Sequence, residues 1–252
     1  MTDHPLGKPP IDAMELAPRR VRAMLGGVVV LDTTRARYLW EWPHYPQYYV
    51  PVDDLAPGVL VEGDGEVRPD RGRARRMNLC VGEVTRRSAA LLYTEEPLAG
   101  LVRFEWDALD AWFEEDEEVF VHPRDPYSRV DALRSTRHVR IELDGVRLAE
   151  SSSPVLLFET GLPARYYLNR TEINFDVLEA SPTATACPYK GRTTDYWSVR
   201  TPVATYPDLA WSYSFPTAGL AAIAGLVCFY NEKVDIHLDG RLLERPVTPF
   251  SA

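Results

Sequence analysis

The feature that most constrains this chain is an internal repeat with a nearly constant spacing. The segment that begins at Arg19 aligns without gaps with the segment that begins at Arg137, at an offset of 118 residues. The matched positions include Leu25 with Leu143, Gly27 with Gly145, Glu41 with Glu159, Tyr48-Tyr49 with Tyr166-Tyr167, and Val59-Leu60 with Val177-Leu178. Self-similarity at one offset is the mark of a duplicated structural unit. The chain is therefore predicted to contain two copies of one fold.

The repeat continues past one inserted residue, where Pro69–Gly72 aligns with Pro188–Gly191. Further along, we match Leu101 with Leu209, and the tract 117–122 with the tract 232–237 by alternation. These matches predict five segments. They are an N-terminal extension (1–17), a degenerate first repeat domain (18–125), a linker (126–136), a second repeat domain (137–242) and a C-terminal tail (243–252).

Each copy is predicted to be mainly β. Val139–Leu143 alternates apolar and polar residues and is followed by Asp144-Gly145, a typical hairpin turn. Aromatic and β-branched runs at 196–200 and 209–215 suit pleated, half-buried surfaces. Thr217–Phe229 follows a proline and is rich in Ala and Leu, which favours a helix, and 107–113 takes the corresponding place in the first copy. Each unit should thus hold several strands and one short helix.

Composition excludes several classes of protein. Apolar residues make up 45% of the chain and charged residues 26%, which are globular values. No apolar stretch approaches the roughly 20 residues of a membrane span, so we expect a soluble, cytoplasmic protein without membrane contact. Residues 1–126 hold 15 basic against 23 acidic side chains, which argues against nucleic acid as a partner. The three cysteines have no disulfide or zinc spacing, so we expect reduced thiols, no metal and no cofactor.

The signature residues of the second copy resemble the bacterial DUF427 family. They are Val139–Gly145, Glu159, Tyr166-Tyr167, Cys187-Pro188-Tyr189-Lys190-Gly191, Tyr196–Val199 and Leu226–Tyr230. The first copy is similar to the degenerate partner of tandem members, and the resemblance covers about residues 18 to 240. It implies a small Mss4-like β-barrel or β-roll in each copy and no particular reaction. A nucleotidyltransferase label is sometimes attached to the family, but nothing here resembles the paired metal-binding carboxylates of such enzymes.

The sharpest candidate for chemistry is the motif around Cys187 and Lys190. Pro188 restricts φ and Gly191 permits conformations that other residues avoid, so the motif predicts a rigid turn between strands. A lysine close to a thiol favours the reactive thiolate. We therefore treat Cys187 as a candidate nucleophile and Lys190 as its partner or as an anion-binding group. The alternative is a purely structural role, in which Cys187 packs as a small buried apolar residue and Lys190 is exposed.

A second candidate feature combines aromatic and polar side chains. Its members are Glu159, Arg165, Tyr166, Tyr167, Tyr189, Gly191 and Tyr196. They could line a pocket for a small anionic or electrophilic molecule, although strand alternation sends Tyr166 and Tyr167 to opposite faces. The alternative is that the aromatic residues form core and cross-strand pairs.

The first copy departs from the motif where the chemistry would lie. Arg68 replaces Cys187, and Arg71 replaces Lys190, while Pro69 and Gly72 keep the turn. Five arginines between 68 and 76 suggest a solvated face, and the acidic run 114–118 reads as a solvated loop that could pair with them. The sequence thus predicts a small-molecule site in the second copy. The alternative is a non-catalytic interaction or structural protein. The sequence is also compatible with a homo-oligomer.

Overall fold

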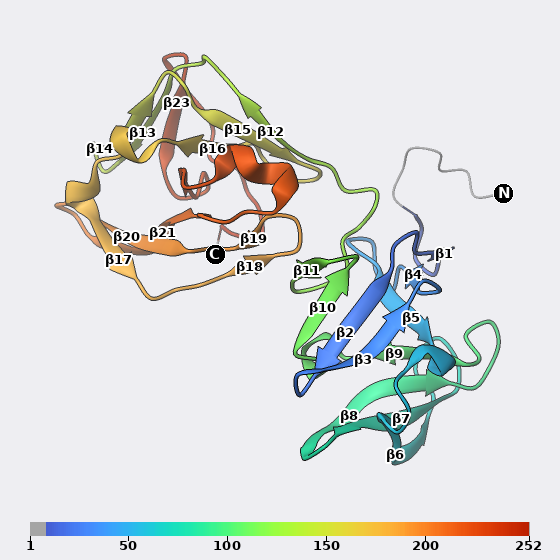
Figure 1. Ribbon diagram of the computed structural model, residues 1–252. Helices are drawn as coiled ribbons and strands as arrows, with labels where there is room; N and C mark the ends of the chain where they lie inside the picture. Colours follow the sequence, from blue (N-terminus) through green and yellow to red (C-terminus); the bar gives the residue numbers. More distant parts are fainter. Residues whose placement is uncertain (1–8, 252) are drawn as a thin grey trace. The chain divides into compact units, whose positions relative to one another are not determined.

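The computed structural model describes residues 9–251 and shows a mainly β chain, as predicted (Figure 1). Contacts divide the chain into two units, the first ending at Tyr127 and the second beginning at Ser128. Each unit has a seven-stranded and a four-stranded antiparallel sheet, and the second has an additional two-stranded sheet. The sheets are open, with free edge strands, rather than closed into barrels. In the part of the chain that is described, no helix is long and apolar enough to cross a membrane.

The first unit has the large sheet order β1-β4-β5-β9-β8-β7-β6 and the small sheet order β11-β10-β2-β3. Its elements are β1 (Met14–Leu16), β2 (Val21–Leu25), β3 (Val28–Thr33), β4 (Arg37–Leu39), β5 (Gln47–Pro51), η1 (Val52–Asp54), β6 (Leu60–Val67), β7 (Ala74–Val81), β8 (Val84–Tyr93), β9 (Leu101–Phe104), η2 (Trp106–Ala108), β10 (Ala111–Glu114) and β11 (Glu117–Val119).

The second unit has the large sheet order β12-β15-β16-β22-β21-β20-β17 and the small sheet order β14-β13-β23-β24. Its elements are β12 (Val130–Arg134), β13 (Val139–Leu143), β14 (Val146–Ser151), β15 (Val155–Glu159), β16 (Arg165–Leu168), η3 (Arg170–Glu172), η4 (Phe175–Val177), β17 (Leu178–Ser181), β18 (Ala186–Cys187), β19 (Gly191–Arg192), β20 (Asp195–Arg200), β21 (Thr205–Ser212), η5 (Ala218–Ile223), β22 (Val227–Phe229), β23 (Asp235–Leu238) and β24 (Arg241–Leu242).

The two units repeat the same topology, which supports the duplication. β2 and β13 occupy positions 118 residues apart, and so do β3 and β14. Both hairpins carry an irregularity at the same place, after Ala23 in one unit and after Ile141 in the other. The segments expected as extension and linker each contain an edge strand of a large sheet, β1 and β12.

Two of the later matches in the repeat are wrong, as strand register shows. Tyr49 pairs with Arg103 and its counterpart Tyr167 pairs with Cys228, so Arg103 corresponds to Cys228. Leu101 therefore corresponds to Leu226 and not to Leu209. The units differ in loop length after the shared turn, and similar alternation in neighbouring strands conceals the shift.

The second wrong match concerns the tract 117–122. Ala23 pairs with Trp112 and its counterpart Ile141 pairs with Ile236, so β10 corresponds to β23. The tract 117–122 thus begins with β11, which follows β10 in the chain and corresponds to β24 rather than to residues 232–237.

The predicted helices are also wrong in extent and kind. Thr217–Phe229 contains a 3-10 helix, Ala218–Ile223, which ends before the buried strand β22. In the first unit, 107–113 contains the end of a 3-10 helix and the start of β10. The apolar residues at the end of the predicted helix, Leu226–Phe229, are not helical. Pairing with β16 and β21 makes Val227–Phe229 a strand. Tertiary pairing overrides local propensity there.

The acidic run 114–118 is a hairpin rather than a loop after a helix. Glu114 is buried in β10, where it accepts a hydrogen bond from Tyr48 at 2.6 Å and pairs with Arg19. The arginines between 68 and 76 have other acidic partners, because Arg71 pairs with Asp12 at 2.8 Å, and further pairs join this cluster to Glu62 and Glu95.

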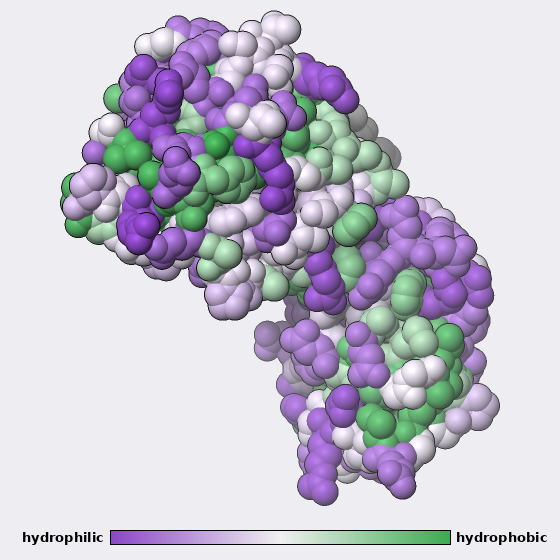
Figure 2. All heavy atoms as spheres, turned by 60° about the vertical axis from the view of Figure 1, so that its left-hand side comes forward, coloured by the Kyte–Doolittle hydropathy of each residue, from purple (hydrophilic) through white to green (hydrophobic). Residues whose placement is uncertain are grey.

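The large sheet of the second unit buries side chains on both faces. One face packs with the small sheet in an apolar cluster that includes Tyr166, Leu168 and Phe229. The other face forms a second cluster with Tyr167, Trp211 and Cys228, which η5 joins through Leu220 and Ile223. Tyr166 and Tyr167 thus lie on opposite faces, as strand alternation predicts. On the face that Figure 2 shows, hydrophilic side chains alternate with neutral and apolar areas.

Candidate functional site

The motif around Cys187 forms a tight hairpin, as its proline and glycine predict. Cys187 in β18 pairs with Gly191 in β19, and Pro188, Tyr189 and Lys190 form the turn between them. Gly191 has φ +95°, in the region that favours glycine. The hairpin places the Cys187 and Lys190 side chains on one short, constrained segment.

A second loop anchors this turn from the outside. The backbone N–H of Thr217 donates to the carbonyl of Lys190 at 3.2 Å, and the Thr217 hydroxyl donates to the carbonyl of Tyr189 at 2.6 Å. A Cβ on Gly191 would lie 3.5 Å from the carbonyl oxygen of Phe215, which leaves ordinary contact distance. The turn is therefore fixed by hydrogen bonds on two consecutive residues.

Replacing Gly191 with alanine is expected to lower the free energy of unfolding by about 1–2 kcal/mol, because an L side chain is strained at positive φ. Space is not the cause, since no neighbour approaches the new Cβ closely. Urea unfolding followed by fluorescence measures the change. Gly219→Ala is the matched control, because Gly219 has no positive φ and no atom within 4 Å of its Cβ position. Equal losses in the two variants would contradict the role assigned to φ.

Lys190 reaches from the turn to the large sheet and pairs there with Glu159 at the end of β15. The two side chains are only 13% and 12% exposed. Burial lowers the pKa of Lys190, but the nearby Cys187 and Glu159 side chains favour its ammonium form and leave the pKa above its ordinary value. Lys190 therefore stays charged throughout the neutral range. The sequence placed Glu159 and Lys190 in one site, and the fold brings them together.

Two tyrosines complete the surroundings of the thiol. Burial, with a further contribution from Cys187, raises the pKa of Tyr213 above its ordinary range, and Tyr167 behaves in the same way. Both phenols therefore keep their protons and can act only as neutral groups. Cys187 itself is partly buried and is a free thiol. The thiol thus lies among a buried ammonium ion, a carboxylate and two neutral phenols.

The remaining predicted aromatic residues are distributed around this cluster. Tyr196 is buried on the same face, and its hydroxyl lies 3.1 Å from that of Tyr230 and 3.2 Å from the hydroxyl of Thr185. Tyr189 is half-buried within the turn. Tyr166 belongs to the core on the opposite face of the sheet, away from Cys187. The sequence grouped both tyrosines with the ligand residues, but Tyr167 lies on the face of Cys228 and Tyr213 while Tyr166 does not, because neighbouring residues of a strand point to opposite faces.

Arg165 is held by a buried ion pair. Its guanidinium donates to both carboxylate oxygens of Glu232, at 2.6 and 2.8 Å, and the two side chains are 8% and 0% exposed. The rings of Trp211, Tyr230 and Phe250 lie 5.7–5.9 Å from the guanidinium carbon. The positive charge of Arg165 is therefore paired with Glu232 inside the protein. The sequence grouped Arg165 with the ligand residues and did not reveal Glu232 as its partner.

Sequence reasoning missed three residues of this region: Tyr213, Cys228 and Glu232. Cys228 lies in β22 between Tyr167 and Trp211, so its side chain points to the same face as theirs. Strand alternation from Trp211 would have placed Tyr213 on that face too. Cys228 lies in the signature segment Leu226–Tyr230, but no local signal marked Cys228 or Glu232 as a site residue, because their neighbours come from distant strands.

The first unit retains part of this arrangement. Register and offset make Glu41, Tyr49 and Tyr93 the counterparts of Glu159, Tyr167 and Tyr213. The Tyr49 hydroxyl donates to Glu41 at 2.8 Å, and Arg103 approaches the same carboxylate at 3.3 Å. Arg103 stands at the position of Cys228. Ion pairs thus replace the thiols in the first unit.

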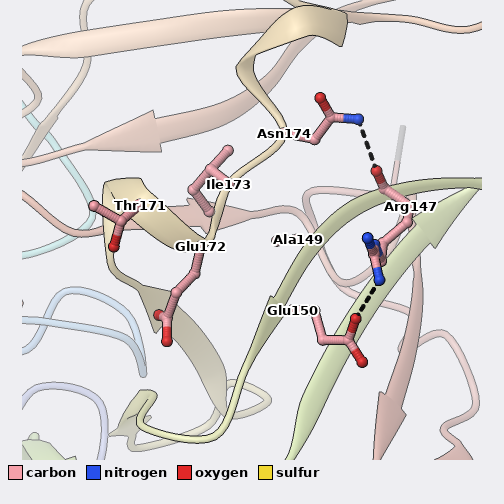
Figure 3. A pocket seen from close by; sticks show the side chains of 7 residues that line it. All are labelled: Arg147, Ala149, Glu150, Thr171, Glu172, Ile173 and Asn174. Atoms are coloured by element: carbon pink, nitrogen blue, oxygen red, sulfur yellow. Dashed lines mark hydrogen bonds and ion pairs between the residues drawn. The ribbon is translucent and has the colours of Figure 1, made fainter.

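An open cavity of about 360 Å³ lies elsewhere in the second unit (Figure 3). It is lined by Arg147, Ala149, Glu150, Thr171, Glu172, Ile173 and Asn174. Arg147 pairs with Glu150 at 2.6 Å, and Glu172 accepts a hydrogen bond from Ser151 at 2.8 Å. Thr33 and Asp54 make the corresponding bond in the first unit. None of the predicted site residues lines this cavity. The bond between Ser151 and Glu172 joins strand β14 to the 3-10 helix η3.

Within residues 9–251, fold and site together define a tandem-repeat β protein in which the second copy, and not the first, holds a thiol beside a buried lysine–carboxylate pair. The comparisons agree with the duplication. The chain matches the family described as Domain of unknown function (DUF427) twice, over residues 13–115 and 131–240, and it belongs to that family. No curated protein matches it.

Proposed function

We propose that the second copy binds and reacts with a small anionic or electrophilic molecule, with Cys187 as the nucleophile. The observation that carries this proposal is the Lys190 ammonium ion, which pairs with the Glu159 carboxylate and whose charged form the nearby Cys187 side chain favours. A fixed positive charge favours a thiolate, which is the nucleophilic form of cysteine. Glu159 holds the ammonium in place through their ion pair. The proposed reaction uses side chains of the protein itself.

The phenols of Tyr167 and Tyr213 support this assignment. Because burial raises the pKa of both groups, each keeps a proton at neutral pH. Neutral O–H groups near the sulfur can stabilise charge that develops on a substrate oxygen. They also exclude bulk water from one side of the thiol.

Phe215 supplies an apolar border to the proposed site. Its side chain is 85% exposed, and its backbone passes next to Gly191. The neighbouring Ser214 is held by Thr194, with their hydroxyls 2.9 Å apart. A large apolar side chain on a constrained loop offers contact area at little entropic cost. We therefore propose that the substrate has an apolar part next to its reactive group.

The proposed reaction requires Cys187 in the reduced state, which a reducing compartment such as the cytoplasm maintains. A relationship to Mss4-like folds belongs to the same proposal. It rests on the resemblance of the motif and not on barrel closure, since the sheets of both units are open.

One observation favours a non-catalytic role instead. Lys190, Tyr189 and Thr217 tie the hairpin to the sheet and to the adjacent loop. The same contacts would stabilise the fold of an interaction or structural protein without any reaction. Thiol reactivity separates the two functions, because packing alone gives Cys187 no enhanced rate.

The test is limiting alkylation of the native protein with iodoacetamide at pH 7, followed by mass spectrometry of each cysteine peptide. We expect Cys187 to react at least about tenfold faster than Cys80, which is also partly exposed and lies 3.8 Å from the Thr85 hydroxyl. Cys228 is fully buried and should not react. Equal rates for Cys187 and Cys80 would favour the structural role and overturn the proposed one.

A further inference from the structure

A strap of the chain, residues 246–251, contacts the buried ion pair of the second unit. The Thr248 hydroxyl donates to the Glu232 carboxylate at 2.5 Å. The centre of the Phe250 ring lies 5.8 Å from the guanidinium carbon of Arg165. The strap thus presents two groups to the rest of the unit, an aromatic ring and a hydroxyl donor.

The strap also folds on itself. The backbone N–H of Ser251 donates to the carbonyl of Thr248 at 3.0 Å, and the N–H of Thr248 donates to the Ser251 hydroxyl at 2.9 Å. The Phe250 side chain is 43% exposed, so its ring is only partly covered. Because these hydrogen bonds are local, the strap keeps its turn when it moves away from the sheet. Segments with few buried contacts open at low cost.

An aromatic surface, made by Trp211, Tyr230 and Arg165, lies next to Phe250. The ring centres of Trp211 and Tyr230 are 4.4 Å apart, and they lie 5.9 and 5.7 Å from the guanidinium carbon. The Phe250 ring is 6.1 Å from that of Tyr230. Rings pack well against rings, and a guanidinium attracts the electron-rich face of a ring. This aromatic surface therefore suits an aromatic occupant.

Hydrogen-bond contacts connect the aromatic surface with the hairpin of the candidate site. The Tyr230 hydroxyl lies 3.1 Å from that of Tyr196, which lies 3.2 Å from the hydroxyl of Thr185. Thr185 precedes Cys187 by two residues. Tyr196 and Trp211 also share one apolar cluster. A molecule on the aromatic surface would thus lie beside the segment that carries the thiol.

The first unit has different residues at the positions of the aromatic surface. The constant offset places Gln47 where the second unit has Arg165, and strand register places Leu91 where it has Trp211. The aromatic surface therefore belongs to the unit that holds Cys187.

We propose that the aromatic surface binds the ring of a substrate and that the strap occupies this place until the substrate displaces it. The inference rests on the proposed function, because the ring is assigned to the molecule that reacts at Cys187. The strap shows the chemistry of the occupant: a ring in place of Phe250, and an O–H or N–H donor in place of the Thr248 hydroxyl.

Glu232 sets the charge of this substrate. Its carboxylate accepts the donor, and it already neutralises Arg165, so an anionic group next to it would meet repulsion. Of the anionic and electrophilic molecules in the proposed function, the aromatic surface thus selects a neutral aromatic electrophile with a hydrogen-bond donor.

The experiment titrates 4-fluorophenol, a neutral ring with a hydroxyl donor, into the full chain and follows its ¹⁹F resonance. A strap that is closed in about nine chains of ten weakens the apparent affinity about tenfold. Phe250→Ala should therefore lower the dissociation constant at least about tenfold. Val247→Ala is the matched control, because Val247 lies in the same strap and is 94% exposed. It should change the affinity less than about twofold.

Two further probes test the class of substrate in Phe250→Ala. The probe 4-fluorotoluene lacks the donor, and 4-fluorobenzoate is an anion. Each should bind at least about tenfold more weakly than 4-fluorophenol, because a hydrogen bond to a charged group is lost or replaced by repulsion. Equal binding of the three probes would overturn the assigned chemistry. A gain in affinity that persists when Tyr230→Leu is added would place the probe elsewhere and overturn the site.

The results separate this inference from the proposed function, since none of the probes carries an electrophile. Unchanged affinity in Phe250→Ala overturns the strap inference, even where Cys187 reacts fast with iodoacetamide. Increased affinity together with slow alkylation of Cys187 removes the reaction, and the assignment of the ring to a substrate of Cys187 is then overturned.

Discussion

Replacing Arg165 with methionine is expected to lower the free energy of unfolding by about 3–5 kcal/mol, the largest effect that we predict for one residue. The change leaves the Glu232 carboxylate, which is 0% exposed, without its bidentate partner. An unpaired buried charge costs about this much, because it has lost water and gained no counter-charge. The Thr248 hydroxyl, which donates to Glu232 at 2.5 Å, cannot replace a guanidinium. Urea unfolding at pH 7 measures the loss.

Two comparisons test the cause of this loss. The double variant Arg165→Met with Glu232→Leu should recover most of the stability, since it removes both charges and keeps apolar volume. Arg200→Met breaks an ion pair with Glu179 in which both partners are at least half exposed, and it should cost under about 1 kcal/mol. If the double variant is no more stable than Arg165→Met, the loss comes from packing against the aromatic rings and not from the charge.

The Arg165 deficit should also depend on pH. Burial raises the pKa of Glu232, but Arg165 and Thr248 lower it further, so the folded value lies below the ordinary 4.5. A depressed acid pKa gives stability that is present above the unfolded value and lost as pH falls through the folded value. In Arg165→Met the unpaired buried carboxylate has a raised pKa instead, so its cost is relieved when it binds a proton. The difference between wild type and Arg165→Met should thus be largest in alkaline solution and should shrink as pH falls. A difference that stays constant down to pH 3 would contradict this.

Replacing Lys190 with methionine is expected to slow alkylation of Cys187 about tenfold or more. The attraction between two charges about 4 Å apart near a protein surface is on the order of 4 kcal/mol, and a tenfold rate change needs only part of it. The same change should cost roughly 2–3 kcal/mol of stability, because it leaves the Glu159 carboxylate, which is 12% exposed, without its charged donor. Peptide mass spectrometry and urea unfolding measure the two effects.

The matched control is Arg192→Gln, which removes an exposed positive charge from the same hairpin. It should change the alkylation rate less than threefold, since solvent screens an exposed charge. A similar loss of rate in both variants would mean that net charge, and not the position of Lys190, governs the thiol.

Alkaline pH gives a further check on Lys190. Its folded pKa lies above the ordinary 10.5, so its contribution to stability is complete below the unfolded value and is lost as pH rises through the folded one. The stability difference between wild type and Lys190→Met should therefore be constant from neutral pH to about pH 10 and should decrease above it.

The sequence by itself determined the features that depend on local pattern. A constant offset revealed the duplication, because equivalent strands keep their spacing where the connecting turns keep their length. Alternation predicted the strands and sent Tyr166 and Tyr167 to opposite faces. The proline and glycine of the motif predicted the turn at 188–191, since both act on φ within a few residues. Local composition likewise predicted a helix over Thr217–Phe229, although pairing with distant strands makes the end of this segment a strand.

The tertiary structure decided which charged and reactive groups meet. Glu159 and Lys190 are 31 residues apart, and Arg165 and Glu232 are 67 apart, so no local pattern fixes either pair. Strand register also decided that Cys228 corresponds to Arg103, which exposed the paired loss of thiols in the first copy. Periodicity gives the face of a residue within its strand. Its partner across the sheet is set by register and sheet order, because these depend on burial summed over the whole unit.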